Sequence, residues 1–356
     1  MSGFSSKGSG SGGSSVVGLG GGSVASNLAV GTGALAANTT GYSNVAVGEG
    51  AGAALTTGHD NVLLGPVSAA SMTTGNQNTF LGSTAAPFAV SASQNVAVGY
   101  SALAGISSSV GNVAVGYGAL LDVAGGANYN IGIGYNAGSA VAYTGNIAIG
   151  YEALYYEQHN SYNVAIGYQA MLVGQNFDRG VAVGYQALTL NTGNQNTAIG
   201  YSSLAANTSG GNNFAIGYQS GNDAMISITT ASNQGVLGNN TTTNITAKVA
   251  LTVTSDARDK VVLGDVPLGL DFVYALKPVA YQFKVSRDDA TPSGRVRYGF
   301  LAQDILPLEG SSPVIIDATD PEHLRYNESD LVAALVNAVQ TLSARVFALE
   351  AKLAAA

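Results

Sequence analysis

Short apolar triplets separated by glycine and polar residues recur along the first two thirds of the chain. The unit reads Asn-x-Ala-Val/Ile-Gly-Tyr-x-Ala-Leu, as in NVAVGYSAL (95–103) and NIAIGYEAL (146–154). Because a fixed period marks a repeat architecture, each unit is expected to form one structural coil. The central glycine returns twelve times, mostly every 17 residues, at Gly31, Gly48, Gly65, Gly82, Gly99, Gly116, Gly134, Gly150, Gly167, Gly184, Gly200 and Gly217.

Within each unit, the x-Ala-Val/Ile triplet alternates as a short strand does, and the glycine after it permits a tight bend. Turn-forming stretches such as TGNQN (74–78 and 192–196) separate the units. The pattern predicts a mainly β fold, a β-roll or β-solenoid of twelve coils over residues 27–238. Its apolar residues are mostly small, so one coil encloses little core, and we expect three chains to associate around an axis.

The charged residues divide the chain into further segments. Before residue 248 the only basic residues are Lys7 and Arg179, although the chain carries 13 in all. We expect a Gly/Ser-rich arm at 1–26 that attaches the chain to other proteins of its assembly, and a threonine-rich β linker at 239–254. A charged α+β domain should follow at 255–356.

Composition excludes several classes of function. A net charge of −8 offers no basic surface for nucleic acid. The chain has no cysteine, and its three histidines, His59, His159 and His323, lack the spacing of metal ligands, so we expect neither metal nor cofactor. No uninterrupted apolar run approaches the roughly 18 residues that span a bilayer, so no membrane insertion is expected.

The end of the chain has a helical apolar pattern with alternating intervals of four and three residues. This is the spacing of a coiled-coil seam, although a helix that docks on its own domain would look similar over so few turns. The pattern supports association of the chains, as expected for a homotrimer, but it does not by itself fix their number. The seam residues are Leu335, Val339, Leu342, Val346, Leu349 and Leu353.

The segment SDARDK (255–260) opens the charged domain, and GLDFVYALKPVAYQF (269–283) and YGFLAQDI (298–305) follow it in order. These motifs resemble the intramolecular chaperone at the C-terminus of phage endosialidases and many tail fibres. The resemblance implies a domain that trimerises, templates folding of the fibre and then cuts the chain just before the serine, here between Thr254 and Ser255.

Ser255 and Lys260 are the candidate catalytic pair, with Asp256 and Arg258 shaping the site. A serine hydroxyl is a weak nucleophile until a base removes its proton, and a lysine serves as that base only when its amine is neutral. Partial burial in the folded assembly would favour the neutral amine. The alternative interpretation makes Ser255 an ordinary helix N-cap. Any enzymatic activity would be at most a single-turnover self-cleaving serine endopeptidase.

The repeats resemble the head of trimeric autotransporter adhesins, which is a trimeric left-handed β-roll with Asn-x-Ala-Ile-Gly coils. In eight units a tyrosine follows the glycine, and these should form a ladder that either packs on itself or offers a sugar-stacking surface. The tyrosines are Tyr100, Tyr117, Tyr135, Tyr151, Tyr168, Tyr185, Tyr201 and Tyr218.

Together these features predict a structural tail fibre of a virion, made in the host cytoplasm. The arm at 1–26 would attach it to other virion tail proteins, and the fibre would contact a glycan or protein receptor on the host surface. One alternative is a bacterial trimeric surface adhesin, which would need an export signal and a membrane anchor that the sequence does not display. Another is a glycan-depolymerising tailspike, although no pair of carboxylates has a spacing that indicates hydrolysis.

Overall fold

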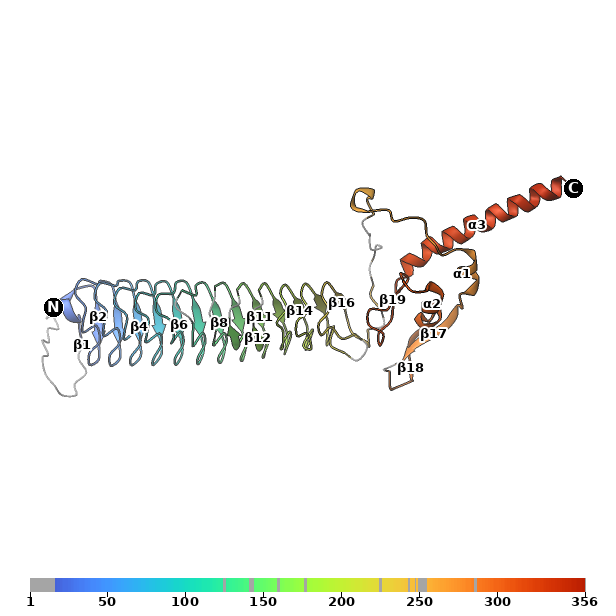
Figure 1. Ribbon diagram of the computed structural model, residues 1–356. Coiled ribbons are helices and arrows are strands. Elements are labelled where there is room, and N and C mark those ends of the chain that lie inside the picture. The colour runs from blue at the N-terminus through green and yellow to red at the C-terminus, as the bar shows by residue number, and fades with distance from the viewer. Residues whose placement is uncertain are drawn as a thin grey trace. The chain divides into compact units, whose positions relative to one another are not determined.

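The chain forms two compact units, Met1–Asn239 and Asn240–Ala356. The computed structural model (Figure 1) describes residues 17–355 without 124–125, 141–143, 159–160, 176–177, 224–225, 243, 247, 249–254 and 285–286, and without the side chains of 157–158 and 174–175.

The first unit is a β-solenoid built on a 14-stranded sheet. Strands from β2 onward pair in parallel and in register, so that Ala97 in one coil lies beside Ala114 in the next. Every glycine of the predicted series directly follows a strand, which confirms the repeat, and β16 adds a strand beyond the last predicted unit. The parallel strands are β2 (Leu28–Val30), β3 (Val45–Val47), β4 (Val62–Leu64), β5 (Thr79–Leu81), β6 (Val96–Val98), β7 (Val113–Val115), β8 (Ile131–Ile133), β9 (Ile147–Ile149), β11 (Val164–Ile166), β13 (Val181–Val183), β14 (Thr197–Ile199), β15 (Phe214–Ile216) and β16 (Gly235–Leu237).

The described chain begins on the first coil. Strand β1 (Val17–Gly18) pairs antiparallel with β2, and the 3₁₀ turn η1 (Gly21–Ser23) follows it. These residues fall inside the stretch 1–26 that the sequence assigns to an arm, and β1 is a strand paired with the first coil. A second small parallel sheet joins β10 (Tyr156–Gln158) and β12 (Val173–Gln175) of successive coils.

The repeated glycine is required by close stacking of the coils. Gly99 has φ of +140°, and a Cβ atom added there would lie 2.4 Å from the carbonyl oxygen of Gly116. The same relation links Gly116 to Gly134, at 2.3 Å. Only a residue without a side chain fits between coils at this bend.

The core of the solenoid is narrow, as the small apolar residues predict. The central alanine of most strands, such as Ala97 and Ala114, is fully buried and packs with leucines such as Leu103 and Leu120. Both leucines have positive φ, near +50°, which costs free energy in each coil. Burial of these side chains offsets that cost, so stability depends on stacking with the neighbouring coils.

A ladder of buried asparagines runs through the solenoid beside this core. The side-chain oxygen of Asn95 accepts the backbone N–H of Asn112 at 2.9 Å, and the amide nitrogen of Asn95 donates to the Ser109 carbonyl at 2.9 Å. Asn112 in turn accepts the backbone N–H of Asn130. Because a buried amide without a partner is costly, the first residue of the repeat is an asparagine for this structural reason.

The second unit has a small α+β core in which Phe272, Ile305, Ile316 and Leu331 pack together. Asn337 holds the extended segment before the first helix, since its side-chain nitrogen donates to the Val266 and Leu268 carbonyls. The elements are η2 (Ala257–Asp259), α1 (Leu270–Ala275), β17 (Val279–Lys284), β18 (Pro292–Gly299), α2 (Ala302–Glu309), β19 (Ile316–Asp317), β20 (Arg325–Tyr326) and α3 (Glu328–Ala354).

Helix α3 confirms the predicted C-terminal helix and is 27 residues long. By length and composition it is apolar enough to cross a membrane, and it is the one such helix among the described residues. Its sequence contains no long uninterrupted apolar run, because polar residues such as Asn337, Gln340 and Thr341 separate the apolar positions. All six residues of the predicted seam are solvent-exposed in the single chain, from Leu335 at 39 % to Leu353 at 81 %.

Candidate self-cleavage site

Ser255 and Lys260 lie together at the start of the second unit. The short turn η2 separates them, and the Lys260 backbone N–H donates to the Ala257 carbonyl as the turn ends. The turn brings the Lys260 Nζ to 2.6 Å from the Ser255 Oγ, within hydrogen-bond distance. A neutral amine at this position would be placed to accept the hydroxyl proton.

Asp256 and Arg258 stabilise the turn between these two residues. Asp256 is the N-cap of η2, where its carboxylate accepts the Arg258 backbone N–H at 2.9 Å. The Arg258 guanidinium also bonds both carboxylate oxygens, with Nη2 to Oδ2 at 2.6 Å. These side-chain and backbone hydrogen bonds from Arg258 lower the pKa of Asp256. The alternative interpretation of Ser255 as the N-cap is therefore wrong, because Asp256 occupies that position.

The pair is open to water in the single chain. Ser255, Asp256, Arg258 and Lys260 are all exposed, and Thr254, which would supply the scissile carbonyl, lies outside the described residues. The apolar residues directly after the pair are also uncovered, with Val261, Val262 and Leu263 exposed by 85, 88 and 95 %. One chain therefore brings the two candidate groups together without desolvating the amine.

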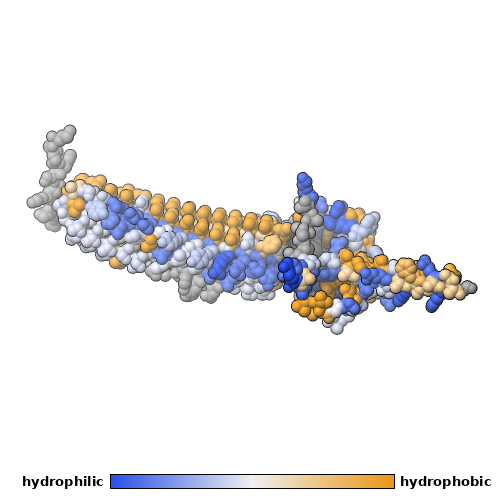
Figure 2. All heavy atoms as spheres, turned by 90° about the horizontal axis from the view of Figure 1, so that it is seen from above, coloured by the Kyte–Doolittle hydropathy of each residue, from blue (hydrophilic) through white to orange (hydrophobic). Residues whose placement is uncertain are grey.

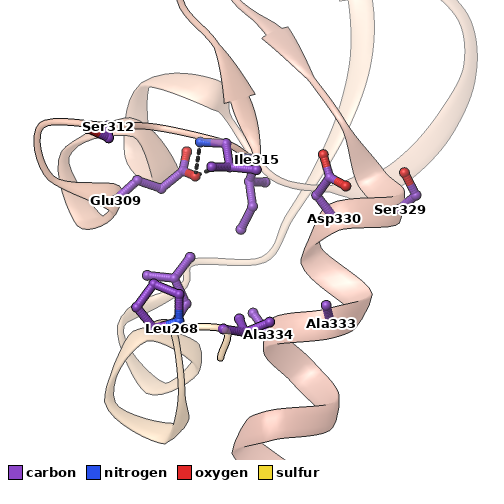
Figure 3. Close-up of a pocket in the computed structure, with 11 residues that line it drawn as sticks. Leu268, Glu309, Ser312, Ile315, Ser329, Asp330, Ala333 and Ala334 are labelled. Carbon is purple, nitrogen blue, oxygen red and sulfur yellow. Dashed lines mark hydrogen bonds between the residues drawn. The ribbon is translucent and has the colours of Figure 1, made fainter. Parts of the chain in front are cut away.

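A separate pocket of about 320 Å³ lies between α2, the loop after it and the start of α3 (Figure 3). Its carboxylate from Glu309 accepts the backbone N–H groups of Val314, Ile315 and Ile316 at 2.6–2.9 Å. Those bonds close the loop onto α2. Neither Ser255 nor Lys260 lines this pocket, so it is not part of the candidate cleavage site.

The eight predicted tyrosines form one continuous stack along the solenoid. Successive rings are nearly parallel, with centroids 4.9–5.3 Å apart, from Tyr100 to Tyr218. Each ring inside the stack has neighbours on both faces, while 40–58 % of each residue remains exposed. The geometry favours packing of the rings on one another over a sugar-stacking surface, which would need free ring faces.

The geometry around Ser255 coincides with the start of a known sequence family. Residues 255–308 match the chaperone of endosialidase family. This chaperone-of-endosialidase segment runs from Ser255 through η2, α1, β17, β18 and most of α2. It confirms the resemblance read from the SDARDK motif and the two motifs after it, while residues 309–356 lie beyond the match. A search of curated proteins and a search of solved structures each gave no match.

Sequence reasoning placed the site residues but did not explain two features. The asparagine of the repeat is part of the motif, and its position directly before most of the strands was a signal of a buried ladder. The contact of Asn337 with the Val266 and Leu268 carbonyls had no local signal, because it joins segments about 70 residues apart.

Proposed function

We propose that this chain is a trimeric virion tail fibre involved in host attachment, matured by cleavage between Thr254 and Ser255. The observation that carries the proposal is the 2.6 Å contact of Lys260 Nζ with Ser255 Oγ at the first residue of the chaperone-of-endosialidase segment. The family match supports the folding-chaperone role of the segment from Ser255, and the contact between Lys260 and Ser255 supports its release by cleavage.

Cleavage would follow from the chemistry of a serine beside its own peptide bond. Lys260 accepts the hydroxyl proton, and the Ser255 Oγ attacks the Thr254 carbonyl carbon. The bond from that carbon to the Ser255 nitrogen breaks, the nitrogen takes up a proton, and an ester forms on Oγ. Water then hydrolyses the ester, which leaves a carboxyl group on Thr254 and a free amine on Ser255.

The exposed amine explains why release would wait for assembly. In the single chain the Lys260 amine is exposed to water. Desolvation favours the neutral form. The exposed apolar residues Val261–Leu263 are positioned to be covered by neighbouring chains, and such packing would also exclude water from Lys260.

The solenoid supports association through a long apolar surface. The third residue of each parallel strand points outward and is aliphatic and only partly buried, as at Val98, Val115 and Ile149. These residues repeat in register along the sheet, and Figure 2 shows a continuous hydrophobic band along the solenoid. A monomer rarely exposes so large an apolar surface, so the band is suited to contact with other copies of the chain.

Cleavage is tested on a denaturing gel of wild type beside Ser255→Ala and Lys260→Ala. Wild type should give products of 254 and 102 residues, while both variants stay whole. Lys248→Ala, which removes the nearest lysine outside the motif, is the matched control and should cut normally. Cleavage of the Ser255→Ala chain at the same bond would rule out the proposed nucleophile.

Assembly is tested by light scattering of the uncleaved Ser255→Ala protein, whose mass should be three times 35.6 kDa. The double variant Val98→Asp/Val115→Asp, on the apolar band, should not form the trimer, because association would bury unpaired charges. The control Gln77→Asp/Gln94→Asp changes exposed polar positions of nearby coils and should leave the trimer intact. A stable wild-type monomer would refute the trimer.

Host attachment is tested by adding the purified, cleaved fibre to bacterial cells before the phage that carries it. Occupied receptors should lower the rate of phage adsorption, whereas the released segment 255–356 should have no effect. Unchanged adsorption at saturating fibre would contradict the role in attachment while leaving the maturation chemistry standing.

A further inference from the structure

A row of residues in the left-handed conformation runs along one corner of the solenoid, directly before the residue that precedes each strand, which is a buried asparagine in most coils. We name it the corner row. Its members have φ between about +54° and +79°, and all of its non-glycine residues are exposed. Two tyrosines are its only members that are neither polar nor glycine. The corner row consists of Ser43, Asp60, Gln77, Gln94, Gly111, Tyr129, Gly145, Tyr162, Arg179, Gln195, Asn212 and Asn233.

The two tyrosines lie against glycines of the preceding coils. A Cβ atom added at Gly111 would be 2.6 Å from Cδ1 of Tyr129, and one added at Gly145 would be 2.8 Å from Cδ1 of Tyr162. Each ring therefore covers the place where the side chain of the preceding corner-row residue would project. The same Gly–Tyr arrangement occurs twice in succession, so it is a built feature of these coils.

Their exposure distinguishes these rings from the tyrosine stack. Tyr129 is 64 % exposed and Tyr162 is 60 % exposed, more than any of the eight stacked tyrosines. No described aromatic ring stacks on either of them. Each ring has glycine backbone against one side and remains more than half exposed, which is the form of an aromatic platform.

The spacing of the platforms follows from the coil geometry. Tyr129 and Tyr162 are two coils apart, which corresponds to about 10 Å along the axis. At the intervening position, Gly145 has no side chain of its own, and the ring of Tyr162 covers that position instead. Successive sugar rings of an extended oligosaccharide are about one coil spacing apart, so two sugars separated by one other sugar would reach both platforms.

A cation continues the row on the next coil. Arg179 is the only lysine or arginine between residues 8 and 247. It is exposed, and no described acidic side chain forms an ion pair with it. The neighbouring carboxylate of Asp178 accepts the Ser161 backbone N–H at 2.7 Å. A free guanidinium presents a fork of donors that suits a carboxylate.

We propose that the corner row from Tyr129 to Arg179 binds an acidic oligosaccharide, an inference that rests on the proposed role in host attachment. The faces of two sugars stack on Tyr129 and Tyr162. The guanidinium of Arg179 pairs with the carboxylate of a third sugar. The ligand lies along the solenoid axis across the two rings, and the tyrosine stack from Tyr100 to Tyr218 takes no part.

The test measures binding of the full-length Ser255→Ala protein to a panel of uronic-acid and sialic-acid tetrasaccharides beside neutral tetrasaccharides. The double variant Tyr129→Gln/Tyr162→Gln removes the platforms, and its backbone is compatible because Gln77, Gln94 and Gln195 adopt the same conformation. Two stacked tyrosines replaced in the same way, Tyr185→Gln/Tyr201→Gln, form the matched control.

Wild type and control should bind acidic members, and the platform variant should bind them about 100-fold more weakly, about tenfold for each ring. Arg179→Gln, an exposed change that needs no repacking, should lose about tenfold of the preference for acidic over neutral sugars. Absence of wild-type binding to every acidic member, or equal binding by the platform variant, would overturn the proposal.

The same preparations separate this inference from the proposed function. The corner-row site alone would be refuted if the wild-type protein trimerises, cleaves and blocks adsorption while the platform variant binds acidic sugars as well as wild type does. A chain that neither trimerises nor cleaves would refute the proposed function, and the binding comparison between variants would still be read independently.

Discussion

Replacing Asn95 by alanine tests whether the buried asparagine ladder holds the coils together. Asn95 is fully buried, and its side chain joins three coils. Its oxygen accepts the Asn112 backbone N–H at 2.9 Å, and its nitrogen donates to the Ser93 and Ser109 carbonyls, each at 2.9 Å. Alanine would remove these three bonds, together with the 3.2 Å bonds that join the Asn95 side chain to the Asn78 and Asn112 side chains, without offering an alternative partner.

The expected loss follows from counting which groups stay satisfied. The Ser93 carbonyl also accepts the Gly111 N–H, and the Ser109 carbonyl also accepts the Ser93 N–H, so both keep a partner. The Asn112 N–H has no second described acceptor and would be orphaned in the interior. An orphaned buried donor costs about 1–3 kcal/mol, and the vacated space adds to it, so we expect a loss of about 2–4 kcal/mol.

The free energy of unfolding is measured by urea titration with circular dichroism in the Ser255→Ala background, where the chaperone segment stays attached. Gln94→Ala is the control, because Gln94 is exposed and its change should cost less than about 0.5 kcal/mol. Equal stability of Asn95→Ala and Gln94→Ala would show that the ladder does not stabilise the solenoid.

Three further predictions concern other contacts. Gly116→Ala places a Cβ 2.3 Å from a backbone oxygen and should cost about 3–5 kcal/mol in urea titration, whereas Gly50→Ala, with open space around it, should cost only about 1–2 kcal/mol. Tyr135→Ala removes two ring stacks and should cost about 1–3 kcal/mol in the same titration, about twice the loss for Tyr218→Ala, which ends the stack. Because hydrogen bonds from Arg258 lower the pKa of Asp256, their ion pair persists above about pH 4 and is lost only as pH falls through that lowered pKa. Asp256→Asn should therefore slow cleavage, measured on gels, by a constant factor between about pH 5 and about pH 9, and a factor that changes with pH would contradict this role.

Much of the solenoid could be predicted because its repeat is local and regular. A glycine every 17 residues and an alternating triplet before it specify a strand and a bend in each unit, and the sequence displays both directly. The φ of +140° at Gly99 and its close approach to Gly116 explain why the glycine recurs. The leucines in left-handed conformation, such as Leu103, could not be predicted, because local propensity disfavours them and only stacking between coils makes them acceptable.

The candidate cleavage site divides in the same way. The motif from Ser255 to Lys260 indicated a candidate catalytic pair, although the spacing of these residues alone favours a helix cap at Ser255. The turn that places Lys260 Nζ at 2.6 Å from Ser255 Oγ, with Asp256 as the cap, had to be seen in three dimensions. The turn conformation decides which polar atoms come into contact, and the six residues 255–260 are compatible with several turn conformations.

The sequence by itself determined the repeat, the strands and bends within it, the division of charge and the family of the segment from Ser255. Each of these depends on residues that are near one another in the chain or on a fixed period. The tertiary structure alone decided that Tyr129 and Tyr162 lie over Gly111 and Gly145 in line with Arg179. Such a row is created by stacking successive coils in register, which brings together residues about 17 positions apart that have no local influence on one another.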